Sequence, residues 1–145
     1  MPWLLDTNAV IAVINDPRGL VASRVRRKAP DAVFASSIVM HELYYGTFKS
    51  TKQAANLAVV ESLVFSVLAL DSEDARAGGA IRAQLKIAGT PIGPYDVLIA
   101  GQALCRGLTL VTNNLSEFAR VPTLRVEDWS VASVGAITRQ ARTRK

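Results

Sequence analysis

Cysteine and histidine are nearly absent from this 145-residue chain, which contains one of each, Cys105 and His41. A single cysteine excludes an internal disulfide and fits a reducing compartment, so a cytoplasmic protein is expected. One cysteine and one histidine cannot complete a zinc site within one chain. No nucleophile elbow accompanies His41, which argues against serine–histidine catalysis. Any bound metal must therefore be held by carboxylates, a ligand set that favours Mg²⁺ or Mn²⁺.

Long apolar runs are lacking as well. The longest candidate, residues 57–70, is interrupted by Glu61 and Ser62 and is shorter than the roughly 18 residues of a membrane-spanning helix. The first residues lack the basic flank and apolar stretch of a secretory signal. Half of the residues are nevertheless apolar, enough to bury a core. We therefore expect a soluble chain with one compact domain, residues 1–130, followed by a basic tail, residues 131–145.

Acidic residues are outnumbered, because 12 Asp and Glu stand against 17 Lys and Arg, which gives a net charge of +5. The basic residues form two clusters, of which one falls early in the chain and the other at its end. The clusters are Arg24, Arg26, Arg27 and Lys28, and Arg139, Arg142, Arg144 and Lys145. Each can be a solvated surface, as a helix face or a frayed tail, or an electrostatic footprint for a polyanion such as nucleic acid. Composition alone does not decide between these interpretations.

Short apolar runs alternate with helical patterns along the chain, separated by turn and cap residues. The expected strands cover residues 3–5, 33–35, 65–68, 108–112 and 124–126. The expected helices cover residues 9–14, 20–28, 37–48, 51–63, 72–87 and 94–106. Asn113 and Asn114 are predicted to form a turn. This alternation indicates an α/β layer fold with a mostly parallel sheet.

Two acids are predicted to lie at the edge of the sheet where ligands bind in such a fold. In an open α/β sheet, ligands gather at the carboxyl ends of the strands. Asp6 ends the first predicted strand, and Asp96 falls in the first turn of the helix that follows Gly93 and Pro94. Each has a structural explanation too: Asp6 can cap a helix, and the helix dipole favours an acid in the first turn by about 0.3–1 kcal/mol.

Glu42 is a third acid of interest, because its predicted helix places it on the same face as Ile38 and Tyr45. No Lys or Arg stands three or four residues away from it. Either Glu42 lies at the edge of the apolar stripe, or its inward carboxylate needs a distant partner or a metal. Three neighbouring carboxylates repel one another unless a divalent cation compensates them. Held by Asp6, Glu42 and Asp96, Mg²⁺ could bind a phosphodiester and activate water, so phosphodiester hydrolysis is the expected chemistry.

Four ordered motifs resemble those of the PIN-domain nucleases. They are Asp6-Thr7-Asn8, the segment 41–46 (HELYYG), the segment 93–96 (GPYD), and the segment 111–114 (VTNN) with Glu117 and Phe118. The segment 125–129 (RVEDW) is similar to the VapC toxins of bacterial toxin–antitoxin pairs. The resemblance runs across residues 2–130. It implies a PIN-like α/β/α sandwich and a Mg²⁺-dependent endoribonuclease, with Mn²⁺ as a substitute, that forms a homodimer and binds a cognate VapB-type antitoxin.

Carried over residue by residue, the resemblance makes Asp6, Glu42 and Asp96 catalytic acids, with Asp6 and Asp96 as metal ligands. Many family members have a further aspartate where this chain has Asn114, and Glu117 is the candidate to supply that carboxylate instead. The alternative for Glu117 is a solvent-facing helix residue.

Three other residues of these motifs receive supporting roles. Thr7 and Thr112 are expected to orient carboxylates through their hydroxyl groups rather than to bind metal. His41 has no visible catalytic partner and is interpreted as structural.

Two other functions remain open at this stage. One is a non-catalytic RNA-binding PIN module, and the other is a Mg²⁺-dependent phosphatase, although the Asp-x-Asp pair of such enzymes is broken here by Asn8. Resemblance to toxins that cut transfer RNA makes the anticodon-loop region of tRNA the expected target. The apolar stretch 57–70 suggests that a partner, the antitoxin, covers part of the surface and the active-site groove.

Overall fold

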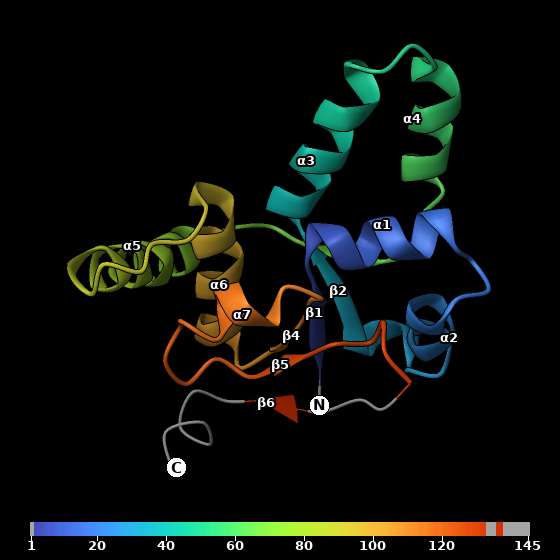
Figure 1. The fold of residues 1–145 in the computed structure, drawn as a ribbon. Helices are drawn as coiled ribbons and strands as arrows, with labels where there is room; N and C mark the ends of the chain where they lie inside the picture. Colours follow the sequence, from blue (N-terminus) through green and yellow to red (C-terminus); the bar gives the residue numbers. More distant parts are fainter. Residues whose placement is uncertain (1, 133–135, 138–145) are drawn as a thin grey trace.

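The computed structural model describes residues 2–132 and 136–137, which form one sheet flanked by helices (Figure 1). The strand order is β3-β2-β1-β4-β5-β6. The first five of these strands are parallel, and β6 pairs antiparallel with β5. The strands are β1 Trp3–Leu5, β2 Val33–Ser36, β3 Ser66–Leu68, β4 Thr109–Val111, β5 Val126–Glu127 and β6 Ala136–Ile137. The prediction of an α/β fold with a mostly parallel sheet is confirmed.

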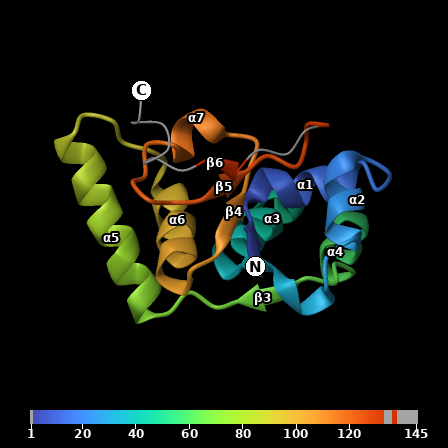
Figure 2. The same ribbon diagram turned by 90° about the horizontal axis from the view of Figure 1, so that it is seen from below.

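In the described part of the chain, seven α-helices and one short 3₁₀ helix accompany the strands. They are α1 Thr7–Asn15, α2 Leu20–Arg26, the 3₁₀ helix Pro30–Ala32, α3 Ser37–Phe48, α4 Gln53–Glu61, α5 Ser72–Ile87, α6 Pro94–Arg106 and α7 Leu115–Phe118. Helices α5 and α6 lie together at one side of the sheet, with α1, α2 and α4 at the other, in both ribbon views (Figures 1 and 2). None of the helices described is long and apolar enough to cross a membrane.

Most helix bounds agree with the sequence prediction, and the differences have local causes. Helix α1 begins at Thr7 because the Asp6 side chain caps it. Helix α4 is shorter than the predicted 51–63, and Ser62 ends it. The predicted turn at Asn113 and Asn114 continues into α7, a single helical turn that the sequence analysis missed.

The centre of the sheet is apolar on both faces, as a parallel sheet covered by helices requires. Leu4 and Leu5 of β1 and Leu110 of β4 have no exposed surface. In the pairing register, Leu5 lies opposite both Ala35 of β2 and Val111 of β4. The three strands therefore end level, and the residues after them emerge at the same edge. This edge includes the point between β1 and β4 where chain connections diverge, the usual ligand position of such sheets.

The early basic cluster is largely occupied by contacts within the chain. The guanidinium of Arg24 donates to the backbone oxygens of Trp129, Val131 and Ala132 at 2.6–2.9 Å. Lys28 places its ammonium over the ring of Trp3, 4.3 Å from the centroid. These contacts favour a structural role for this cluster over a polyanion footprint. The terminal cluster, Arg139, Arg142, Arg144 and Lys145, lies outside the described residues.

Candidate active site

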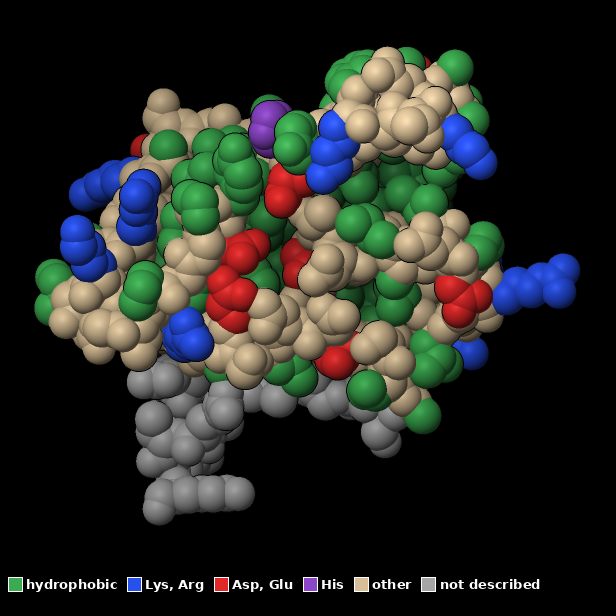
Figure 3. Space-filling model, turned by 45° about the horizontal axis from the view of Figure 1, so that its top comes forward, with side chains coloured by type: hydrophobic (Ala, Val, Ile, Leu, Met, Phe, Trp, Pro, Cys, Tyr) green, Lys and Arg blue, Asp and Glu red, His purple; other side chains and the backbone are tan. Residues whose placement is uncertain are grey.

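Acidic side chains gather in a hollow on one face of the molecule, with the single histidine of the chain at its rim (Figure 3). The hollow lies at the edge where β1 and β4 end. Four of the acids predicted from the sequence interact here electrostatically: Asp6, Glu42, Asp96 and Glu117. They come from the end of β1, from α3, from α6 and from α7, so the fold joins segments that are far apart in sequence.

Asp6 follows β1 directly and is 5% exposed. One of its oxygens accepts the backbone N–H of Ala9 at 2.8 Å, so it also caps α1 as the structural explanation expected. Burial raises the pKa of Asp6 to about 6, hydrogen bonds from Thr112 and Ala9 oppose the rise, and repulsion from Glu42 adds to it. A single cap does not require such burial, and the acid remains hard to ionise while no cation is near.

Glu42 is half-buried and has a distant partner, but this partner is neutral. The hydroxyl of Thr7, the first residue of α1, donates to Glu42 Oε1 at 2.6 Å. Thr112 in turn is hydrogen-bonded to Asp6. Both contacts agree with the prediction that Thr7 and Thr112 orient carboxylates through their hydroxyls.

Asp96 and Glu117 form the second half of the site. Asp96 lies in the first turn of α6, where a side chain on Gly93 would come within 3.1 Å of its Oδ2. Burial raises the pKa of Asp96 to about 7, helped by a hydrogen bond with Glu117 and by repulsion from Glu117, Glu42 and Asp6. Asp96 and Glu117 therefore lie close enough to influence each other's charge.

Glu117 is not the solvent-facing residue of the alternative interpretation. Its Oε1 accepts the backbone N–H of Gly93 at 3.1 Å, and its Oε2 accepts the side-chain amide of Asn114. Asn114 thus holds the carboxylate of Glu117 in place through its side-chain amide. The neighbouring Asn113 accepts from the amide of Asn8 at 3.4 Å, which ties this loop to α1.

Asp128 is a fifth acid that the sequence analysis did not select. It contributes to the raised pKa of Asp6 and is held by Ser130, whose backbone N–H donates to Asp128 Oδ1 at 2.8 Å. Asp128 directly follows β5 just as Asp6 directly follows β1. The predicted strand 124–126 ended one residue too early for the rule about strand ends to select it.

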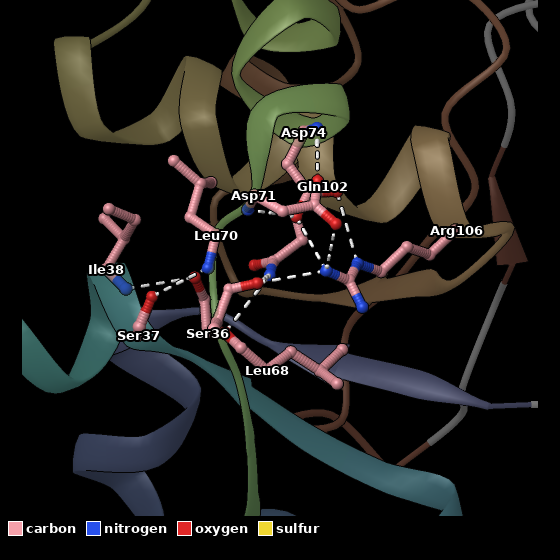
Figure 4. A network of polar contacts seen from close by, with 10 residues as sticks. Ser36, Ser37, Ile38, Leu68, Leu70, Asp71, Asp74, Gln102 and Arg106 are labelled. Atoms are coloured by element: carbon pink, nitrogen blue, oxygen red, sulfur yellow. Dashed lines mark hydrogen bonds and ion pairs between the residues drawn. The ribbon is translucent and has the colours of Figure 1, made fainter.

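A polar network fixes the helix that carries Asp96 (Figure 4). Arg106 at the end of α6 donates to Asp74 Oδ2 at 2.8 Å, and Asp74 is fully buried. Hydrogen bonds and the charge of Arg106 hold the pKa of Asp74 below its usual value, although burial opposes this. The amide of Gln102 donates to the backbone oxygen of Leu68 at 3.2 Å. The C-terminal half of α6 is thus anchored to the end of β3 and to the first turn of α5.

The donor set fits a hard divalent cation in type and charge. Where the structure is described, ion pairs involve Arg106 with Asp71 and Asp74, and none reaches the acids of the hollow. In the same part of the chain, no three His, Cys, Asp or Glu side chains stand close enough together to enclose a metal ion. Mg²⁺ does not need such an enclosure, because one or two carboxylates and several waters are its usual ligands. Asp6 and Asp96 could provide these two carboxylates.

Comparison with known proteins gives consistent matches over most of the chain. The PIN domain family matches residues 3–124. The tRNA(fMet)-specific endonuclease VapC of Salmonella typhimurium is 44% identical over 131 residues, which cover 89% of this chain and 98% of that protein. Ribonuclease VapC2 of Haemophilus influenzae is 41% identical with the same coverage. The crystal structure of DNA-bound VapBC from Salmonella typhimurium superposes with a TM-score of 0.84, at 44% identity, over 89% of this chain and 98% of the other.

Proposed function

The chain belongs to the PIN-domain family and, within it, to the VapC ribonucleases, and from this membership we propose that it is a Mg²⁺-dependent endoribonuclease toxin. One observation carries the proposal. Four carboxylates from separate segments meet in one hollow, two of them, Asp6 and Asp96, have raised pKa values, and none has a cationic partner there in the described chain. Carboxylates placed together without a cation destabilise the folded protein. Their presence therefore indicates a role in binding or chemistry.

In the proposed mechanism, Asp6 and Asp96 hold the cation at the edge of the sheet. Bound Mg²⁺ would supply charge for the phosphodiester and lower the pKa of water to generate the nucleophile. Glu42, anchored by Thr7 through Oε1, keeps Oε2 available to orient the attacking water and accept its proton. Glu117, anchored by Gly93 and Asn114, positions Asp96. Thr112 fixes the Asp6 carboxylate, so Asp6, Glu42 and Glu117 are each oriented by neutral groups.

The proposed substrate is RNA, and within RNA the anticodon-loop region of tRNA. The tRNA(fMet)-specific relative from Salmonella typhimurium supports this substrate through its identity over nearly its whole length.

A VapB-type antitoxin is the proposed partner. The similar crystal structure from Salmonella typhimurium is of a VapBC assembly. In this chain, α1, α3 and α4 enclose a cleft of about 260 Å³ with apolar lining that includes Ile14, Leu43 and Val60. Apolar side chains are also exposed in the stretch 57–70, where Val59 is 42% and Val64 90% exposed. We propose that the antitoxin covers the cleft and that the toxin itself forms a homodimer in the cytoplasm.

The first test compares Asp6→Asn and Asp96→Asn with the parent in a cleavage assay on total RNA, with Mg²⁺ and with EDTA. Each variant keeps the side-chain shape and removes one charge, so cleavage should fall about 100-fold or more. Mg²⁺ should also protect the variants less against thermal unfolding, since a ligand at a hundredfold excess over Kd contributes about 2.7 kcal/mol. Mapping of the cleavage ends identifies the RNA and the bond.

Asp31→Asn is the matched control, because Asp31 is an exposed acid outside the hollow, and this variant should cleave like the parent. EDTA-sensitive cleavage at parental rates by both site variants would overturn the proposed metal site. Tight RNA binding without any cleavage by the parent would instead favour the non-catalytic RNA-binding module.

A further inference from the structure

Two aromatic side chains stand at the mouth of the hollow, each one residue before a site acid. His41 precedes Glu42 on α3, and Tyr95 precedes Asp96 on α6. Their rings contact each other across the two helices, with centroids 5.5 Å apart and planes at 58°. Both are exposed to solvent, Tyr95 by 45%. The pair therefore presents aromatic surface beside the carboxylates.

The helices that carry His41 and Tyr95 are held in place by capping and by burial. Helix α3 is capped by the buried Ser36, whose hydroxyl accepts the backbone N–H of Ile38 at 3.1 Å. Helix α6 begins at Pro94 and buries Val97 and Ile99 in its first two turns. Two rigid helices thus fix the separation of the rings, and an incoming ligand would need to order little of the protein.

Other aromatic rings nearby already have partners of their own. Lys49 lies over the ring of Tyr45, 4.8 Å from its centroid. Tyr44 and Phe48 stack on each other, with centroids 6.3 Å apart and planes at 17°. Tyr95 and His41 are distinguished by their position next to the acids, where a phosphodiester must sit to be cleaved. From the rim of the hollow, this pair can be reached by the base of a nucleotide whose phosphate is bound at the acids.

We propose that Tyr95, supported by His41, is the stacking surface for an unpaired nucleobase next to the scissile phosphate. This inference rests on the proposed ribonuclease function and names a substrate-binding residue for it. Aromatic side chains stack on bases that are splayed out of single strands and loops, and paired bases cannot reach such a surface. Because every base has a π face, the pair selects an unpaired base rather than a particular one.

The test measures cleavage of an anticodon stem-loop RNA by Tyr95→Ala, Tyr95→Phe, His41→Ala and the control Tyr45→Ala. Tyr95→Ala should lower kcat/KM by about 10-fold or more, through KM rather than kcat, because stacking is lost in the ground state as well as in the transition state. Tyr95→Phe should restore most of the loss, since the ring remains. His41→Ala should show a smaller loss. Tyr45→Ala removes an exposed tyrosine of α3 whose ring face is already covered, and should match the parent.

A second readout reports on stacking without cleavage. The Asp6→Asn variant binds the same RNA carrying 2-aminopurine at the loop position next to the cleaved bond, and stacking on a ring should quench its fluorescence. Adding Tyr95→Ala should remove this quenching. The increase in melting temperature caused by Mg²⁺ without RNA should be the same for Tyr95→Ala and the parent, which shows that Asp96 is undisturbed.

Parental kcat/KM and unchanged quenching in Tyr95→Ala would overturn the inference. A fall in kcat with loss of Mg²⁺ protection would overturn it too, because Tyr95 would then act by positioning Asp96. Failure of the proposed function looks different, since Asp6→Asn alone would then cleave RNA at the parental rate.

Discussion

At the scale of single residues, the raised pKa values of Asp6 and Asp96 connect stability to pH. Both rise above the ordinary value of 3.8, to about 6 and about 7. Between pH 3.8 and these raised values, the two carboxyl groups hold protons in the folded protein that they release in the unfolded chain. The resulting contribution to stability is fully present below about pH 4 and is lost as pH rises through 6 and 7.

We therefore expect the metal-free protein in EDTA to lose melting temperature between pH 5 and pH 8. The double variant Asp6→Asn, Asp96→Asn should lose less, because it lacks both titrating groups. Mg²⁺ binding should strengthen over the same interval, since the cation competes with protons for the carboxylates. Thermal unfolding at both pH values, with EDTA and with Mg²⁺, measures all three effects. Equal pH dependence in the parent and the double variant would contradict the assignment.

The sequence allowed the three acids Asp6, Glu42 and Asp96 to be selected because each borders an apolar segment without a nearby cation. It could not show that Thr7 and Glu42 are partners, since 35 residues separate them and local spacing carries no such information. The position of Glu117 beside Asp96 likewise depends on α7, a helix of four residues that is too short for periodicity to reveal. Asp128 was missed because the predicted last strand ended at residue 126, one residue before the observed end of β5.

At the scale of elements, helices α5 and α6 approach each other closely at Gly78 and Gly101. A side chain on Gly101 of α6 would come within 2.4 Å of the backbone nitrogen of Gly78 on α5. Two backbones can approach this closely because neither residue has a Cβ. This contact could not be read from the sequence, where Gly78, Gly79 and Gly101 look equally unfavourable in a helix.

Gly101→Ala should destabilise the protein by about 1–3 kcal/mol, because the added methyl group forces the two helices apart. Gly79→Ala should instead be neutral or stabilising by up to about 1 kcal/mol, since Gly79 is exposed in the same helix as Gly78 and a Cβ there meets nothing within 4 Å. Urea unfolding of both variants gives the comparison. A stability of Gly101→Ala equal to that of Gly79→Ala would mean that α5 and α6 are less closely packed than described.

At the scale of the whole molecule, acidic and basic residues have different expected roles: the acids serve the chemistry, and basic residues serve the affinity for RNA. The early basic cluster is mostly engaged in contacts that hold the fold together, through Arg24 and Lys28. The acids lie in the hollow, and four basic residues fall in the last seven positions of the sequence. The terminal cluster is the better candidate for contacts with the RNA backbone.

Removal of residues 139–145 should weaken RNA binding and flatten its dependence on salt, because up to four phosphate contacts are lost. The position of the cleaved bond should not change, since the carboxylates are untouched. Filter binding over a series of salt concentrations, beside mapping of cleavage ends, checks both statements. Complete loss of cleavage at saturating RNA would show that the tail is needed for the reaction itself.

The spread of the site along the chain also has a consequence for biosynthesis. Synthesis from the N-terminus delivers Asp6 and Glu42 early, whereas Asp96, Glu117 and the strand β4 that pairs with β1 come much later. Until β4 is synthesised, β1, which Asp6 follows, can pair only with β2. A ribosome that stops before α6 therefore releases a fragment that has Asp6 and Glu42 but lacks Asp96 and Glu117, with an unfinished sheet. If the proposed function holds, such a fragment should not cleave RNA, and activity is expected only from the nearly finished chain.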